Sequence, residues 1–406
     1  MLKTIVIAGG GAAGFFAAIN IAEKLPKARV IILEKSSKLL EKVRISGGGR
    51  CNVTHACFEP KQLVKFYPRG ERELLSVFMQ FSPTNTIQWF EKKGVKLKRE
   101  KDGRMFPVSD NSETIVNCFL HAATQSGIEV QLHDGIERLH FNEADKTWKI
   151  TSGNNKNISA DAVVICTGSA VKPWQILNEI GCDIVPSVPS LFTFNTKDER
   201  LRNLAGVSLK TASVEIKNLK LKETGPMLIT HWGLSGPAIL RLSAWGARKL
   251  NECGYKFEIV IDFSGLGLNE VQQQLENFKT NNPKKQISTH SFFDIPERLW
   301  QQIIPLEIQE KKWADLSKKD LIKISESIAV AKFQITGKST FKDEFVTAGG
   351  VSLKQIDFKT MQAKQFPNLY FAGEVLDIDA ITGGFNFQAA WSTAWVASEA
   401  ISKNFK

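Results

Sequence analysis

Runs of apolar and polar residues at the start of the chain predict a strand, a helix and a second strand. Residues 4–8 form an apolar run typical of a buried strand, and the apolar spacing from 12 to about 25 is helical. Residues 29–34 form a second apolar run that ends in an acid, Glu34. This order of elements is typical of a β-α-β unit in a parallel sheet.

The turn between the first strand and the helix has the spacing G-x-G-x-x-G, from Gly9 to Gly14. We expect Gly9 to make the tight turn, Gly11 to let the backbone approach a pyrophosphate, and Gly14 to let helix and strand pack closely. The N–H groups of the first helical turn would then face the phosphates. Glu34 would accept hydrogen bonds from ribose hydroxyls and disfavour a 2′-phosphate, so the unit favours FAD or NAD over NADP. The alternative is a glycine-rich turn in an ordinary α/β protein.

The same alternation continues toward the middle of the chain. Residues 36–50 are polar and glycine-rich, and a helical region follows in which Phe78, Phe81, Ile87 and Phe90 have helix-compatible spacings. A further helix is predicted from Ser112, as its N-cap, to Gly127. Strands are predicted at 128–132, 148–150 and 162–166, the last of which ends at Thr167 and Gly168.

Proline residues near Ser190 indicate a crossing into a second domain. Beyond it the pattern predicts strands and a lysine-rich helical block, and we expect the chain to return to the first domain near Thr340. The strands are predicted at 209–216, 227–230, 256–263 and 368–374, the helical block at 269–328, and a final helix from Gly384 to about 401.

The carboxyl-terminal part distinguishes FAD from NAD. The strand at 368–374 ends in Gly373-Glu374, which would suit the ribityl or pyrophosphate region of FAD, a longer cofactor than a nicotinamide dehydrogenase must hold. The N–H groups that begin the helix after Gly384 would face the flavin ring and stabilise its anionic reduced form. The alternative is a plain helix start.

The fold class predicted from these elements is α/β. A Rossmann-like, glutathione-reductase-like FAD-binding domain is expected at 1–190 and 340–406, and an inserted β-rich substrate domain at 191–339, with a small helical subdomain at about 269–328.

Composition adds little to this picture. Hydrophobic residues make up 43% and charged residues 23% of the 406, which is ordinary for a soluble globular enzyme, and no apolar run is long enough to cross a bilayer. The first residues resemble the start of a signal peptide, but cleavage would remove the first strand, so we expect a cytoplasmic protein without a membrane partner. The six cysteines have no metal-ligand spacing and are expected to be reduced thiols.

The formal net charge is +11. Seven basic residues stand against three acidic ones between Glu91 and Arg104, and further lysines gather at 284–285, 311–312 and 318–319. Such patches can track nucleic acid or steer an anionic substrate, and the alternative is a solvated face.

Several longer motifs resemble the bacterial NAD(P)/FAD-dependent flavoprotein family that includes aminoacetone oxidases and the 3-dehydro-bile-acid reductase group. The resemblance covers nearly the whole chain and does not depend on the first glycine turn alone. Its markers are residues 9–14, Glu34-Lys35, the S-G-G-G-R-C-N block at 46–52, 103–107, 189–191, 230–237, 347–351, 368–377 and 383–386.

This resemblance implies tightly held, non-covalent FAD and an inserted β-rich domain with a helical subdomain. It implies FAD contacts at Ala13, Glu34, Lys42, Val43, Ser46, Asn52, Val130, Glu374 and Asn386. Joined with the glycine turn and the strand ends, the candidate FAD set is Gly9, Gly11, Ala13, Gly14, Glu34, Lys35, Lys42, Val43, Ser46, Gly47, Asn52, Val130, Thr167, Gly168, Gly373, Glu374, Gly384, Phe385 and Asn386.

The chain departs from the family pattern in three places. Phe385 stands where tyrosine is common, Ala380 where glycine is frequent, and Ser392-Thr393 where Ser-Gly is common. These changes leave FAD binding in place and put the identity of the substrate in doubt.

No catalytic residue is assigned. His231 could supply a proton near neutral pH or have a structural role, and Gly236-Pro237 could serve an anion or simply begin a helix. Arg50 could balance flavin or substrate charge. Cys51 could react or merely pack against the cofactor.

We therefore predict an FAD-dependent oxidoreductase that acts on a small organic substrate, reducing an activated C=C bond with NAD(P)H as a transient donor. No second dinucleotide motif is visible, so NAD(P)H would dock beside the flavin. The alternatives are a flavin amine oxidase, an RNA-modifying flavoprotein suggested by the basic charge, and a non-catalytic FAD sensor.

Overall fold

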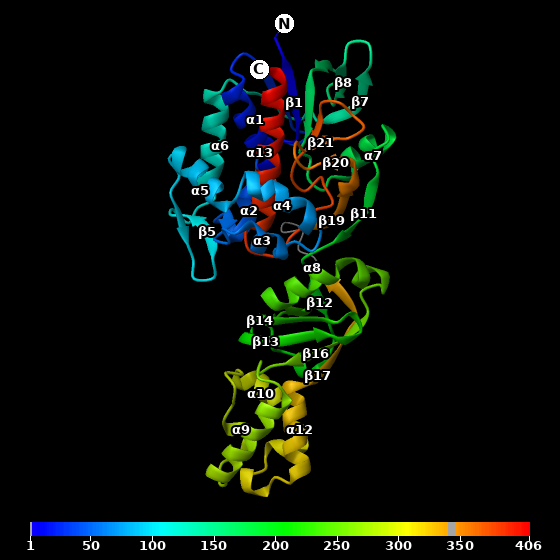
Figure 1. Ribbon diagram of the computed structural model, residues 1–406. Helices are drawn as coiled ribbons and strands as arrows, with labels where there is room; N and C mark the ends of the chain where they lie inside the picture. The colour runs from blue at the N-terminus through cyan, green and yellow to red at the C-terminus, as the bar shows by residue number, and fades with distance from the viewer. Residues whose placement is uncertain (1, 340–345) are drawn as a thin grey trace. The chain divides into compact units, whose positions relative to one another are not determined.

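A computed structural model describes residues 2–339 and 346–406 (Figure 1). The chain divides into two compact units, 1–188 with 342–406 (unit 1) and 189–341 (unit 2). The predicted return of the chain near Thr340 lies outside the described residues.

Unit 1 is built on a seven-stranded sheet in which β1 lies between β10 and β2. These three strands are parallel, and Ile7 of β1 pairs with Val164 on one side and Ile32 on the other. Strands of a parallel sheet are buried on both faces, which explains the unbroken apolar runs. In sheet order the strands are β20 (Ile356–Asp357), β21 (Gln362–Ala363), β22 (Leu369–Phe371), β10 (Ala162–Ile165), β1 (Thr4–Ala8), β2 (Arg29–Leu33) and β6 (Glu129–Gln131).

Helices α1 and α13 pack against each other, and α6 also contacts α1. Phe16 of α1 lies 4.5 Å from Trp89 and 5.4 Å from Trp391 between ring centroids, so aromatic side chains join three helices in one core. The helices of unit 1 are α1 (Ala12–Lys24), α2 (Glu41–Gly49), α3 (Pro60–Leu63), α4 (Glu71–Gln80), α5 (Pro83–Lys92), α6 (Glu113–Gln125), α7 (Val171–Glu179) and α13 (Phe385–Phe405).

Three smaller sheets complete unit 1. The antiparallel sheet β7-β8-β9 contacts β1 and β10, and β3-β5-β4 carries the segment that follows the S-G-G-G-R-C-N block. Their strands, with the pair β11-β19, are β3 (Thr54–His55), β4 (Leu97–Arg99), β5 (Arg104–Pro107), β7 (Ile136–Asn142), β8 (Thr147–Ser152), β9 (Asn157–Ala160), β11 (Ile184–Pro189) and β19 (Thr347–Val351).

Unit 2 has its own antiparallel sheet and its own core. Apolar side chains of the sheet and of the helical block form one buried cluster that includes Phe194, Leu242, Trp300 and Trp313. In sheet order the strands are β17 (Ala331–Ile335), β16 (Phe257–Asp262), β13 (Ser208–Ile216), β14 (Leu221–Ile229), β15 (Gly233–Ser235), β12 (Thr193–Asn195) and β18 (Gly337–Ser339).

Helix α8 packs on β14 and lies outside the predicted helical block, which contains α9 to α12. The helices of unit 2 are α8 (Pro237–Glu252), α9 (Leu268–Asn281), α10 (Glu297–Ile303), α11 (Leu306–Gln309) and α12 (Lys318–Ala329). Among the described residues, the helices are too short or too polar to span a lipid bilayer.

One local prediction was wrong, and one segment has a structure that its composition did not indicate. The polar excursion at 36–50 contains a short helix, α2, which breaks at Ser46 where the backbone becomes extended. Ser112 stands at the start of α6, but its hydroxyl donates to the carbonyl of Arg44 (2.7 Å) and makes no cap hydrogen bond. At Ser112 a contact with a residue 68 positions away outweighs the local capping pattern.

Candidate functional site: a dinucleotide-binding cradle

The first turn of unit 1 has room for a phosphate where the motif predicts it. A Cβ on Gly14 would lie 1.9 Å from the Gly9 carbonyl oxygen, and one on Gly9 (φ 110°) would lie 2.4 Å from the Cys166 carbonyl oxygen, so neither position accepts a side chain. Gly11 differs, because a Cβ there would meet nothing within 4 Å. Helix α1 starts with no side-chain cap and no acid in its first turn, so its N–H groups remain for an anion.

Glu34 follows β2 and is held by the backbone. Its carboxylate accepts from the Gly10 N–H (2.7 Å) and from the Ser36 N–H (2.8 Å). One acceptor direction on each oxygen therefore stays open for ribose hydroxyls. Lys35 is exposed, and Val130 lies in β6, paired in register with Ile32.

Lys42 and Glu374 meet from opposite ends of the chain in an ion pair. The other Glu374 oxygen accepts from the Thr347 N–H (3.2 Å). Two glycines lie close to Glu374, Gly168 in space and Gly373 in sequence. A Cβ on Gly168 would lie 3.9 Å from a Glu374 carboxylate oxygen, and one on Gly373 (φ 77°) would lie 3.0 Å from the Cβ of Ala13. Val43, beside Lys42, is fully buried.

The S-G-G-G-R-C-N block forms a left-handed loop. Gly47, Gly48 and Gly49 have φ values of 59°, 69° and 80°, which side chains disfavour, and a Cβ on Gly48 or Gly49 would meet nothing within 4 Å. Ser46 donates its hydroxyl to the Val43 carbonyl (3.0 Å). This open turn therefore presents backbone, not side chains, to its surroundings.

Asn52 joins this loop to the start of α13. With its amide oriented to satisfy its neighbours, it accepts from the Gly384 N–H (2.9 Å) and donates to the Thr54 carbonyl (3.0 Å). Asn386 donates to and accepts from the backbone of Ala380 (3.1 and 2.9 Å). Phe385 is buried and stacks on Phe66, with ring centroids 4.4 Å apart. These contacts fix the start of the helix.

Sequence reasoning missed His55, the last residue of β3, which follows the S-G-G-G-R-C-N block. Its ring stacks on Phe385 (4.6 Å between centroids), and its Nε2–H donates to the Asp102 carbonyl (3.0 Å). Because Nε2 carries the proton, Nδ1 of the neutral ring is an acceptor, and it is buried without a partner. Burial lowers the pKa of His55, with Arg99 and Arg104 acting in the same direction. The one available signal was its place three residues after Asn52.

The residues considered above as candidates for catalysis differ in burial and in their partners. Cys51 is fully buried, and desolvation raises the pKa of its thiol to about 12, which removes the thiolate that reactivity needs. Arg50 pairs with Glu100 (2.6 Å). His231 is exposed in the turn between β14 and β15 in unit 2, and Pro237 is the first residue of α8.

The buried polar groups fit a dinucleotide. Thr167 Oγ1, at the end of β10, and Gln131 Oε1, at the end of β6, are buried without a hydrogen-bond partner. Buried polar atoms are normally satisfied, so two such atoms at strand ends beside the glycine turn and Glu34 match a ligand that carries hydroxyls and phosphates. The open space at Gly11 agrees with this. When bound, FAD would supply two-electron chemistry at this edge of the sheet.

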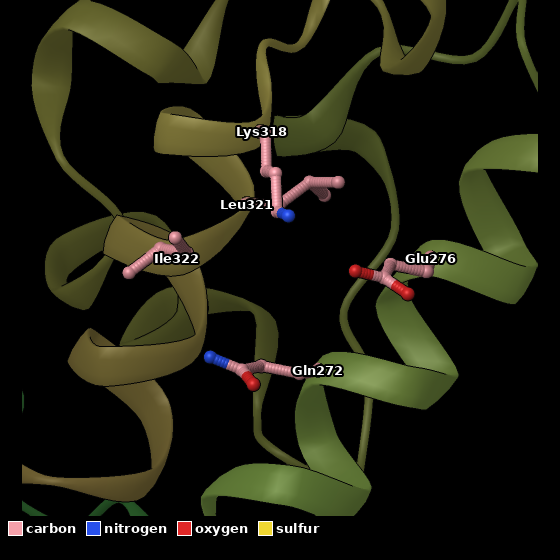
Figure 2. A pocket seen from close by; sticks show the side chains of 5 residues that line it. All are labelled: Gln272, Glu276, Lys318, Leu321 and Ile322. Atoms are coloured by element: carbon pink, nitrogen blue, oxygen red, sulfur yellow. The ribbon is translucent and has the colours of Figure 1, made fainter.

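A small pocket lies in the helical block of unit 2. Figure 2 shows Gln272 and Glu276 extending from α9 toward the space beside α12, which contributes Lys318, Leu321 and Ile322. Within the described residues, no three or more His, Cys, Asp or Glu side chains gather as they would around a metal ion.

The fold and the cradle of unit 1 define a Rossmann-type dinucleotide-binding oxidoreductase with a second, β-rich unit. A model of the family described as "HI0933-like protein Rossmann domain" matches residues 3–400. The chain therefore belongs to this family of flavoproteins and is an FAD-dependent oxidoreductase. The predicted family and fold class are confirmed.

Three relatives match over almost their whole length. The chain is 27% identical to the ribosomal RNA dihydrouridine synthase of Haemophilus influenzae, over 98% of both chains. It is 25% identical to the Escherichia coli protein of the same name, over 97% of this chain and 96% of that one. It is 26% identical to the 3-dehydro-bile acid delta(4,6)-reductase of Clostridium scindens, over 99% of this chain and 100% of that one.

A solved structure supports the fold. The 3-ketosteroid-delta4-(5alpha)-dehydrogenase from Rhodococcus jostii RHA1 has a TM-score of 0.51 and 12% identity, over 98% of this chain and 97% of that one. At this identity the likeness concerns the fold alone.

Proposed function

We propose that the protein reduces a carbon–carbon double bond conjugated with a carbonyl group, that NAD(P)H is the electron donor, and that the bond belongs to a uracil base of ribosomal RNA. The observation that carries this proposal is the shared name of two full-length relatives from different bacteria, both ribosomal RNA dihydrouridine synthases. Dihydrouridine is uridine with its C5–C6 bond saturated. Overall, NAD(P)H and one proton are consumed, the double bond becomes a single bond, and NAD(P)⁺ leaves.

The candidate FAD set of unit 1 would hold the cofactor. Glu34 and Gln131 suit ribose hydroxyls, the open backbone at Gly11 suits the pyrophosphate, and the ion-paired Glu374 suits the ribityl chain. The N–H groups that begin α13 suit the flavin ring, because the helix N-terminus stabilises negative charge.

A second candidate is a small unsaturated ketone. It is favoured by the third relative, a bile acid reductase whose named substrate also has unsaturated carbons. The chemistry is the same and only the molecule that carries the double bond differs. The amine-oxidase alternative has no such relative among those described.

The test starts with the visible spectrum of the purified protein and anaerobic addition of NADH and then NADPH. We expect bound oxidised flavin that bleaches with one of the two nucleotides. The reduced protein is then mixed either with unmodified ribosomal RNA or with a 4-en-3-one steroid, and the products are measured by mass spectrometry. Dihydrouridine in the RNA supports the first candidate, and saturated steroid alone supports the second. Flavin that stays oxidised with both nucleotides would contradict the proposal.

A further inference from the structure

The segment from Lys92 to Arg104 has two kinds of cation. Three of them form ion pairs: Lys93 with Glu23, Lys98 with Asp110, and Arg104 with both Glu100 and Asp102. The other cations are exposed and have no acidic partner within the part of the chain that the structure describes. They are Lys92, Lys96, Arg99 and Lys101. We call residues 96–104, which contain the β4–β5 turn, the basic hairpin.

The lysine-rich helical block of unit 2 lacks such an excess. Residues 268–329 contain nine lysine and arginine residues and nine aspartate and glutamate residues. Lys311 pairs with Asp320 (3.1 Å) and Lys323 with Glu307 (2.9 Å). Positive and negative residues are therefore equal in number in this block, in contrast to the basic hairpin.

The basic hairpin is fixed to the cofactor loop. Arg50 of the loop bonds to Glu100 (2.6 Å), and its guanidinium lies 4.0 Å from the ring centroid of Phe106. Phe106 in turn packs on the loop, since a Cβ on Gly47 would lie 2.9 Å from its ring. The Val53 N–H also donates to the Met105 carbonyl (2.9 Å). These contacts therefore fix the position of the basic hairpin relative to the loop.

The tip of the basic hairpin lies against His55. The Ala56 N–H donates to the Gly103 carbonyl (2.7 Å), and a Cβ on Gly103 would lie 2.6 Å from the His55 ring. Arg99 is close enough to His55 to lower the pKa of its imidazole. Arg99, one of the unpaired cations, is therefore near the residue that packs on Phe385, the first residue of α13.

We propose that the basic hairpin binds the RNA backbone and holds its phosphates beside the cofactor loop. This proposal rests on the proposed function and adds the surface that would position the substrate. Phosphates are the ligand that unpaired, exposed Lys and Arg side chains fit, and such contacts position a strand without reading its sequence. That role agrees with the absence of exposed aromatic side chains from residues 96–104.

The test uses the full-length protein with bound FAD. A triple variant, Lys96→Gln, Arg99→Gln and Lys101→Gln, is compared with a matched control, Lys284→Gln, Lys312→Gln and Lys319→Gln, which removes three exposed cations from the helical block. The probe is an unmodified ribosomal RNA transcript, and its dissociation constant is measured by filter binding at several salt concentrations. The flavin spectrum and circular dichroism report on folding.

We expect the hairpin variant to bind RNA at least about tenfold more weakly and the slope of log K against log salt to fall by about 2, since each lost phosphate contact removes about 0.7 for a single strand. The control should bind like the unmodified protein. Unchanged affinity in the hairpin variant, or an equal loss in the control, would overturn the inference. Failure of the proposed function is separate, because it is read from dihydrouridine formation by the unmodified protein.

Discussion

Gly11 and Gly14 lie three residues apart in the glycine motif, and substitution of each by alanine should affect the stability of the protein differently. We predict that Gly14→Ala destabilises the FAD-free protein by about 1–3 kcal/mol, because its Cβ would lie 1.9 Å from the Gly9 carbonyl oxygen and α1 would have to move. Gly11 has an extended backbone (φ −93°) and open space around it, so Gly11→Ala should change that stability by less than about 0.5 kcal/mol.

The two glycine positions should also differ in their effect on FAD binding. Gly11→Ala should weaken FAD binding at least about tenfold, or about 1.4 kcal/mol, because its methyl group would fill the space predicted for the pyrophosphate. Chemical denaturation of the FAD-free protein and fluorescence titration with FAD measure the two effects. A Gly11→Ala protein that binds FAD normally would place the pyrophosphate elsewhere.

His55 gives a prediction about pH. Burial lowers its pKa in the folded protein below the value of about 6.5 for an unfolded chain, so between these two values the unfolded state binds more protons. The contribution of His55 to folding stability should therefore fall as the pH drops through the unfolded pKa.

Ring proton shifts followed by NMR from pH 8 to pH 5 test this directly, with His55→Gln used to assign the signal. The free energy of unfolding should also depend less on pH in His55→Gln over that range. A folded-state pKa at or above 6.5 would contradict the burial of Nδ1.

At the scale of elements, α13 is tied to three distant segments through Gln388. Its Oε1 accepts from Thr54 (2.5 Å) and Thr86 (2.9 Å), and its Nε2 donates to Ser392 (2.8 Å). Ser392 then donates to the Phe81 carbonyl (2.7 Å). Every side chain in this network is fully buried, so its polar atoms have no water to replace a lost partner.

We predict that Gln388→Leu costs about 2–3 kcal/mol of folding stability, because two hydroxyl groups lose their acceptor inside the core. Urea denaturation of the FAD-free protein measures the cost. Lys403→Gln, at an exposed position of the same helix, is the matched control and should have little effect. Equal stability of both variants would mean that the hydroxyl groups find other partners.

The same element shows what the sequence could and could not predict. The first strand, its glycine turn and the helix after it follow from neighbouring residues, and α13 was expected from Gly384 onward. The partnership of Thr54 with Gln388 spans 334 positions, and no local pattern marks it. His55 was missed for the same reason, since Phe385 and Asp102 become its neighbours only after the sheets assemble. Thr393, noted as a departure from the family, accepts from the Gly373 N–H (3.0 Å), which no spacing rule predicts.

For the whole molecule, two separate cores predict two unfolding transitions. Unit 2 is continuous in sequence and has its own buried cluster, whereas the candidate FAD residues all belong to unit 1. Calorimetry with increasing FAD should raise one transition and leave the other in place. A ligand at 100 times its dissociation constant adds about 2.7 kcal/mol to the state that binds it.

Residues 189–341 expressed alone should melt at the temperature of the insensitive transition. A single transition that shifts as a whole with FAD would show that the two cores unfold as one.

Strand β22 and helix α13 belong to the last part of unit 1, and they pair with β10 and pack on α1. A chain leaves the ribosome from its N-terminus, at about 5–20 residues per second. Unit 2 can therefore fold while β10 still lacks its neighbour β22 and α1 still lacks α13. At that stage unit 2 would be folded while the sheet of unit 1 still lacked β20, β21 and β22, and the cradle would close only after α13 has been made. Binding of FAD would then be a late step in the maturation of each molecule, dependent on free flavin at that time.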